Sequence, residues 1–175
     1  MILIRLLTII IVACVSRSSS QSNGPVRFVT GFYKTYLNAA KQDYFSAEKR
    51  VFSLSALQLL DSNHAVCARK AGTDVCGYDA DCDIFLASQE NGPDLNFKNS
   101  SFRAKLVSPG VVEVSFTVWP GGGAQYKRRL RLSVVRERGR WKLDDITLPD
   151  DNGVFKTENS MRFQIKKEID YYRMY

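Results

Sequence analysis

Apolar residues in the first third of the chain recur at the spacing of an α-helix. Phe28, Phe32 and Tyr36 are four residues apart, so they would share one face of such a helix. Pro25 suits the first helical position, where a missing N–H leaves no hydrogen bond unmade. The pattern therefore predicts a helix over residues 25–41.

Two shorter helical segments follow. Leu54 and Leu57 belong to one apolar face of a second helix, predicted over residues 48–61. Asp83 has the side chain of a helix N-cap, and it precedes a short helical turn expected at residues 84–89.

From residue 102 onward the hydrophobic period changes from that of a helix to that of a strand. Apolar and polar residues alternate in successive segments, which are separated by Pro109-Gly110, by the glycines at 121–123 and by Arg138-Gly139. Strands are thus predicted at 102–106, 112–118, 130–134 and 141–148, followed by a closing helix at 157–172.

Helices that are segregated from a run of antiparallel strands imply an α+β fold. One face of the sheet must be covered by the helices, because it is apolar. The other face is polar and can meet water or a partner. The apolar face carries Val112, Val114, Phe116, Leu130 and Leu132, and the polar face carries Glu113, Ser115, Thr117, Arg129 and Arg131.

Composition narrows the class of protein. The chain has 175 residues, 45% of them hydrophobic and 25% charged, which suits one folded domain rather than a disordered chain. Four cysteines are too few for a disulfide scaffold, and a single His leaves little room for His-rich metal chemistry. No G-x-S-x-G, H-E-x-x-H or P-loop motif occurs, so we expect no enzymatic activity and no resident cofactor.

The N-terminus has the features of a secretory signal. Arg5 precedes an apolar run at residues 6–12, which is too short to span a bilayer. The following Ala13-Cys14 resembles the cleavage site of bacterial lipoproteins. The alternative is later cleavage in the Ser-rich residues 16–22. We predict a signal peptide at 1–13, a lipidated Cys14 with a flexible tether at 14–24, and one domain at 25–175. Val15 after the lipidated residue resembles the sorting signal for the periplasmic side of the outer membrane.

Three cysteines remain in the domain, and an oxidising compartment would favour a disulfide between two of them. Cys67, Cys76 and Cys82 allow three single pairings, each of which leaves one thiol. His64 lies in a segment expected to be irregular, and it could join the cysteines in a zinc site or act with Cys67 as base and nucleophile. Neither spacing is a known signature, so we favour one disulfide and one unpaired Cys.

An acidic stretch offers a calcium site as an alternative. Asp79, Asp81, Asp83 and Glu90 match positions 1, 3, 5 and 12 of an EF-hand loop, whose carboxylates converge on one ion. Ile84 stands where such a loop needs Gly for its sharp turn. Calcium is therefore kept as a possible ligand and not as the leading one.

The pair Asp144-Asp145 is the remaining acidic motif. Adjacent residues of a regular strand point to opposite faces, so at most one of the two carboxylates should enter a pocket. We expect a polar strand edge in which one carboxylate is bonded to a nearby Arg.

Positive charge is concentrated between residues 127 and 142. The formal net charge of the whole chain is +7, and it becomes +6 once Arg5 is removed with the signal peptide. The hairpin alone carries eight Lys and Arg against Glu137, so it accounts for the whole excess. Either these side chains form a solvated strand face, or they form a docking face for an acidic partner or an anionic envelope surface. Arg is well suited to protein interfaces. The candidate partner-binding residues are Arg128, Arg129, Arg131, Glu113, Thr117 and, on the closing helix, Tyr172. Reversing Arg129 and Arg131 is expected to weaken a complex and leave the fold intact.

Three segments carry a family resemblance. They are the Tyr-x-x-Tyr-Leu helix at 33–37, the stretch Asp81 to Gln89, and the closing strand Gly139-Arg-Trp-Lys-Leu-Asp-Asp-Ile146. Together they resemble small bacterial periplasmic lipoproteins related to the nuclear transport factor 2-like fold, over most of residues 26–170. The resemblance implies a curved antiparallel sheet with helices packed on one face, in the form of a cone. Asp83-Ile84 departs from the Asp-Pro that the family often has before Phe-Leu.

Some members of this group act as immunity proteins against toxins of neighbouring bacteria. The resemblance therefore implies a non-enzymatic, lipid-anchored periplasmic protein that blocks a secreted cell-wall-degrading toxin. Its partner would be a protein, with no nucleic acid involved and with membrane contact through the lipid only. The alternative is an envelope module that binds a small ligand or calcium.

Overall fold

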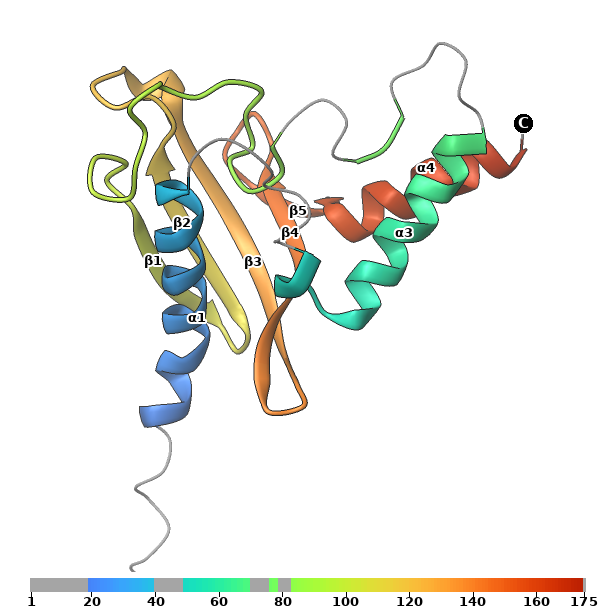
Figure 1. Cartoon of the computed structure of the whole chain (residues 1–175), viewed down its shortest axis with the longest axis horizontal. Coiled ribbons are helices and arrows are strands. Elements are labelled where there is room, and N and C mark those ends of the chain that lie inside the picture. Colours follow the sequence, from blue (N-terminus) through green and yellow to red (C-terminus); the bar gives the residue numbers. More distant parts are fainter. Residues whose placement is uncertain (1–18, 40–48, 70–75, 79–82, 175) are drawn as a thin grey trace, which may run out of the picture.

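The computed structural model of the chain describes residues 19–39, 49–69, 76–78 and 83–174 (Figure 1). The predicted signal peptide and Cys14 lie outside this range, as do Asp79, Asp81 and Cys82. In the described residues the fold is α+β, with three α-helices and one five-stranded sheet. The elements are α1 (Ser19–Asn38), a 3₁₀ turn (Lys49–Val51), α3 (Leu54–Arg69), β1 (Arg103–Ser108), β2 (Val111–Thr117), a second 3₁₀ turn (Ala124–Tyr126), β3 (Lys127–Glu137), β4 (Arg140–Pro149), β5 (Phe155–Ser160) and α4 (Met161–Met174).

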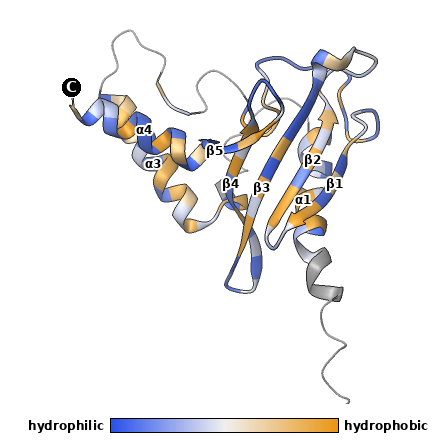
Figure 2. Ribbon diagram, turned by 180° about the vertical axis from the view of Figure 1, so that it is seen from behind, coloured by the Kyte–Doolittle hydropathy of each residue, from blue (hydrophilic) through white to orange (hydrophobic). Residues whose placement is uncertain are grey.

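The sheet is an antiparallel meander with the strand order β1-β2-β3-β4-β5. The predicted alternation is confirmed, since Val112, Val114 and Leu130 are fully buried on one face. Hydrophilic and hydrophobic residues follow each other along the strands in Figure 2. The β3–β4 turn has positive φ at both Arg138 (48°) and Gly139 (78°), which is the conformation that closes a tight hairpin.

Helix α1 lies against β1 and β2 and covers their apolar face. The predicted helix is confirmed, but the buried face is centred on Val29, Tyr33 and Tyr36. Phe28 and Phe32, which were predicted to share the apolar face with Tyr36, are only partly buried. The hydroxyl of Tyr33 donates a 2.8 Å hydrogen bond to the carbonyl of Phe85, so a buried phenol brings the 83–88 turn onto the helix. The domain core is therefore largely aromatic on this side of the sheet.

The start of α1 differs from the prediction. The helix begins at Ser19, so residues 19–24 are helical where a flexible tether was expected. Gly24 lies close to Trp141 of β4, and a Cβ at this position would be 2.8 Å from the indole nitrogen. This close approach shows that α1 contacts β4 at Gly24.

Helices α3 and α4 start near β4 and β5 and run outward side by side in the same direction (Figures 1 and 2). Ala56, Leu60 and Val66 of α3 are buried, as are three apolar residues of α4, Met161, Ile165 and Ile169. The prediction of helices spread over one sheet face is therefore too simple, because these two helices pack largely on each other.

The second predicted helix is displaced along the chain. Its true start is set by Ser53, whose hydroxyl accepts a hydrogen bond from the backbone N–H of Ala56 at 3.0 Å. Leu54, which was expected in the core, is 58% exposed. The helix continues to Arg69, so His64 and Cys67 are helical rather than irregular.

The last helix also begins later than predicted, because residues 155–160 form the edge strand β5. Thr147 pairs with Ser160 and Pro149 with Phe155 across β4 and β5. The hydroxyl of Ser160 accepts a hydrogen bond from the N–H of Phe163 and caps α4. Among the described residues, no helix has both the length and the hydropathy needed to cross a membrane.

Candidate functional site on the open face of the sheet

The polar side of β1, β2 and β3 forms what we call the open face. Strand register places its side chains in three rows, Lys105–Glu113–Arg131, Arg103–Ser115–Arg129 and Thr117–Lys127. Five cations against one carboxylate leave this surface with a net charge of +4. The excess positive charge of the sequence thus has a definite location on the sheet.

Glu113 is the centre of the open face. Its carboxylate oxygens lie 3.1 Å from Lys105 Nζ, 3.2 Å from Arg129 Nη2 and 3.2 Å from Arg131 Nε. The Glu113 side chain is only 7% exposed, whereas that of Lys105 is 68% exposed. The Glu113 carboxylate is thus covered by the stems of its own cationic partners rather than by an apolar core.

Electrostatics at Glu113 follow from this geometry. Burial by itself would raise the pKa of the Glu113 carboxyl. The hydrogen bonds from Lys105, Arg129 and Arg131 outweigh burial and bring the pKa below its usual value of 4.5. The carboxylate stays ionised at neutral pH and holds the two guanidinium groups at defined positions.

Phe155 of β5 fixes the two arginines from the other side. The guanidinium carbon of Arg131 lies 4.2 Å from the centre of the Phe155 ring, and that of Arg129 lies 5.2 Å away. Cation–π contacts of this kind orient guanidinium planes as well as attract them. Phe155 was not among the predicted site residues, because it lies just before the helix predicted at 157–172 and no strand was expected there.

These contacts bear on the expectation that Arg129 and Arg131 can be reversed without effect on the fold. Replacing Arg129 and Arg131 by Glu would place three carboxylates together and leave Glu113 with Lys105 in place of its three cationic partners. Loss of cationic partners destabilises a buried carboxylate, although solvent screening at the half-exposed arginines reduces the cost. We therefore expect the double reversal to destabilise the fold as well as any complex. A cleaner probe of binding uses Arg103 and Lys127, which lie at the exposed rim of the same face.

The six predicted partner-binding residues do not form one surface. Glu113, Arg129 and Arg131 lie together, and Thr117 is at the end of the same face, with its hydroxyl 3.1 Å from the carbonyl of Trp119. Tyr172 packs against the core from α4. Arg128 points to the opposite side of β3, because neighbouring strand residues alternate.

Arg128 lines a separate hollow at the end of β3. Its guanidinium donates to the carbonyls of Ala87 (Nε, 3.0 Å) and Gln125 (Nη1, 2.7 Å). Among the described residues it has no carboxylate partner. The hollow is open and has a volume of about 430 Å³; it is lined by Ala87, Ser88, Gln89, Glu90, Arg128 and Leu148.

The described part of the predicted calcium loop has a structural role. Asp83 Oδ1 accepts hydrogen bonds from the N–H groups of Phe85 (2.9 Å) and Leu86 (3.0 Å), and Oδ2 accepts one from the Tyr36 hydroxyl. Burial raises the pKa of Asp83 although these three bonds lower it. A calcium ion would have to displace protein donors from this carboxylate, and Glu90 is exposed.

One disulfide is present in the described residues, between Cys67 and Cys76. The bond removes Cys67 as a nucleophile, so the His64–Cys67 catalytic alternative is wrong in the oxidised protein. It also removes two thiolates from the zinc set His64, Cys67, Cys76 and Cys82. Sequence could not select this pairing from the three that were open.

The Asp144-Asp145 pair behaves differently from a regular strand. Ser133 pairs with Asp145 and Val134 with Leu143, so Asp144 is the extra residue of a β-bulge. Both aspartates consequently reach Arg162 at the start of α4. Asp144 Oδ1 lies 3.1 Å from Arg162 Nη1, and Asp145 Oδ1 accepts the Arg162 backbone N–H at 3.0 Å.

This cluster joins the beginnings of two helices. The Ser53 hydroxyl donates to Asp144 Oδ1 at 2.5 Å, and Arg162 Nη2 donates to the Ser55 hydroxyl at 2.7 Å. Two parallel helices bring their positive N-terminal dipoles together here, and the two carboxylates stabilise that arrangement. The cluster is therefore a structural joint, in keeping with the expected bond between one carboxylate and an Arg.

Comparison with known proteins gives little more. No known protein family matches the chain, and no curated protein matches it. A crystal structure of a protein of unknown function from Bacteroides thetaiotaomicron VPI-5482, at 2.10 Å resolution, is similar to it. The similarity covers 73% of this chain and 88% of the other, at 19% sequence identity and a TM-score of 0.43, and no inference is drawn from it.

Proposed function

We propose that this protein is a non-enzymatic lipoprotein of the bacterial envelope that binds a protein partner through the open face. In its most concrete form it is an immunity protein that blocks a secreted cell-wall-degrading toxin. The supporting observation is a net charge of +4 on one sheet face, where Glu113 and Phe155 hold Arg129 and Arg131 in place. Cell-wall hydrolases use carboxylate pairs, which such a face would complement.

Preorganisation is what separates this face from an ordinary solvated strand surface. Arg129 and Arg131 are each held by a carboxylate and an aromatic ring, so less side-chain entropy is lost when a partner binds. Arg103 and Lys127 stand beyond them and are free to steer an acidic partner. The proposal includes the envelope location, which rests on residues 1–14, and the cone form of the nuclear transport factor 2-like fold.

The test uses the full chain with Cys14→Ser, to prevent lipidation, and a secreted hydrolase encoded next to it. Binding is measured by isothermal titration, and protection by turbidity of a cell-wall suspension. We expect Arg103→Glu with Lys127→Glu to weaken the complex at least about tenfold, mainly in the association rate. The matched control is Arg136→Glu with Arg138→Glu, which adds the same charge at the distant β3–β4 turn.

Equal effects of the two double variants would mean that the open face is not the docking surface. Absence of a hydrolase gene beside several related loci would contradict the immunity role. Thermal unfolding of each variant shows that any loss of binding is not a loss of folding.

The second candidate is an envelope module for a small anionic ligand in the hollow beside Arg128. It is favoured by a half-buried guanidinium whose partners among the described residues are carbonyl and hydroxyl oxygens. Titration with small carboxylates, followed by NMR shifts of Ala87, Ser88 and Leu148, tests it. Shifts that persist in Arg128→Gln would show that the hollow is not the site.

A further inference from the structure

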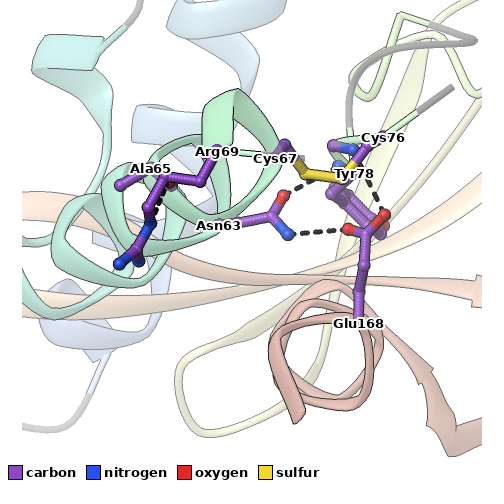
Figure 3. The surroundings of a disulfide bond; sticks show 8 residues. Asn63, Ala65, Cys67, Arg69, Cys76, Tyr78 and Glu168 are labelled. Carbon is purple, nitrogen blue, oxygen red and sulfur yellow. Dashed lines mark hydrogen bonds between the residues drawn. A yellow bond between two sulfur atoms is a disulfide. The ribbon is translucent and has the colours of Figure 1, made fainter. Parts of the chain in front are cut away.

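Cys67, Cys76 and Glu168 meet where α3 runs beside α4. The two sulfur atoms and a Glu168 carboxylate oxygen all lie within 4.8 Å of one another. Figure 3 shows the carboxylate reaching from α4 towards the disulfide between α3 and the following segment. Two sulfur ligands and one oxygen ligand are a set that zinc accepts.

The Glu168 carboxylate is held in place by neighbouring groups. Asn63 Nδ2 donates to Oε2 at 2.7 Å, and the N–H of Gly77 donates to Oε1 at 3.2 Å. Asn63 is 0% exposed, and its own Oδ1 accepts the N–H of Tyr78 at 3.0 Å (Figure 3). Hydrogen bonds of this outer kind orient the ligands of metal sites and commonly change metal affinity by about 10–100-fold.

We propose that this cluster binds a thiophilic divalent cation of the zinc class when the disulfide is reduced. A dithiol reductant supplies two electrons and two protons, which convert the Cys67–Cys76 disulfide into two thiols while the reductant becomes a disulfide. The metal then displaces both thiol protons and bonds to two thiolates and the Glu168 carboxylate. The oxidised and metal-bound forms exclude each other, since a disulfide sulfur has no thiolate charge to offer.

The geometry needs only side-chain movement. Zinc–sulfur bonds of about 2.3 Å in a tetrahedral site place two sulfurs roughly 3.8 Å apart. The Cα atoms of Cys67 and Cys76 are 5.4 Å apart, and rotation about the two Cα–Cβ bonds can separate the sulfurs without moving the backbone. Three protein ligands leave the fourth position to water. Thiolates select zinc, cadmium or cobalt over calcium and magnesium.

The test uses the full chain with Cys14→Ser and Cys82→Ser, so that Cys67 and Cys76 are its only thiols. The protein is reduced with a dithiol, freed of reductant without oxygen, and titrated with Co²⁺. We expect one equivalent to bind with a thiolate-to-cobalt charge-transfer band, and zinc to displace it. The oxidised protein should show no band. Affinity should rise with pH, because two protons leave on binding.

Glu168→Gln is the decisive variant, because it keeps the shape of the side chain and removes its charge. We expect it to weaken Co²⁺ binding at least about tenfold. Asp170→Asn is the matched control, since it removes an exposed carboxylate two residues further along α4. Equal affinities of the two variants would overturn the assignment of Glu168 as a ligand.

Circular dichroism at each step shows whether a change in metal binding accompanies a loss of folding. If the reduced chain loses helix and Co²⁺ or Zn²⁺ restores it, the metal site is supported, because ligand binding then drives folding. A reduced chain that gives no charge-transfer band overturns the proposal, whether it stays folded or fails to refold with metal.

Discussion

Asp145 Oδ1 accepts a hydrogen bond from the backbone N–H of Arg162 at 3.0 Å, so a strand residue caps the first turn of α4. The β-bulge at Asp144 makes this possible, because it turns two neighbouring carboxylates towards the same helix. A helix start needs acceptors for its first N–H groups, and here one of them comes from β4 rather than from the chain before the helix.

Removal of this cap should destabilise the protein. We expect Asp145→Ala to lower the free energy of unfolding by about 1 kcal/mol, which is typical for the loss of a cap. Asp145→Asn keeps an acceptor oxygen. Burial raises the pKa of Asp145 although hydrogen bonds and Arg162 lower it, so the Asn variant also loses the cost of a buried charge. Urea unfolding at neutral pH should therefore find Asn close to the parent, and an Asn variant as weak as Ala would contradict the capping role.

Glu113 should contribute stability that depends on pH. Its pKa is lower in the folded protein than the usual 4.5. The native state therefore releases the Glu113 proton more readily than the unfolded state, and this stabilisation is fully present above pH 4.5. It is lost as the pH falls through the lower, folded pKa. Glu113→Gln should lower the melting temperature at pH 7 and flatten the acid side of the stability profile. Glu158→Gln, an exposed change on β5, is the control.

The Cys67–Cys76 bond closes a loop with a sequence separation of 9 residues. Loop-closure entropy for such a loop corresponds to about 2–3 kcal/mol. We expect Cys67→Ser with Cys76→Ser to reduce the free energy of unfolding by this amount in urea under oxidising conditions. Cys82→Ser should leave it unchanged. A large effect of Cys82→Ser would mean that the pairing differs in solution.

Substitution of Asn63 should lower the free energy of unfolding more than substitution of most other polar residues. Asn63→Ala removes the hydrogen bonds that Asn63 makes with Glu168 Oε2 and with the N–H of Tyr78. We expect a loss of about 2–3 kcal/mol, from unsatisfied groups and a small cavity. Ser62→Ala, at the exposed position next to it, should change stability by less than about 0.5 kcal/mol. Comparable losses at both positions would show that the buried contacts are not what stabilises this joint.

Calcium addition checks the remaining alternative for the acidic loop. Both oxygens of Asp83 accept hydrogen bonds from protein donors, and the turn depends on them. We therefore expect no heat on titration of the protein with millimolar Ca²⁺ and no change in melting temperature. Saturable heat that disappears in Asp79→Asn with Asp81→Asn would instead establish a loop site that rearranges Asp83.

Local patterns determined the α+β class, four of the five strands of the meander and the faces of β2 and β3. These follow from alternation of side chains along a strand and from turn residues such as Arg138-Gly139, which act within a few positions of themselves. Helix α1 was predictable for the same reason, because the spacing of its apolar residues is contained within one segment of the chain. The bond between one aspartate of the 144–145 pair and an Arg was also predictable.

Tertiary structure decided what depends on contacts between distant segments. Residues 155–160 form a strand because they pair with the edge of β4. This pairing replaces the first residues of the helix that was predicted there. Three features bring together residues whose proximity no sequence periodicity encodes. They are the bulge at Asp144, the Cys67–Cys76 disulfide and the contact of Asn63 with Glu168. The same holds for the open face: its charges were visible in the sequence, but only cross-strand register shows that Glu113 holds Arg129 and Arg131 and leaves Arg103 and Lys127 exposed.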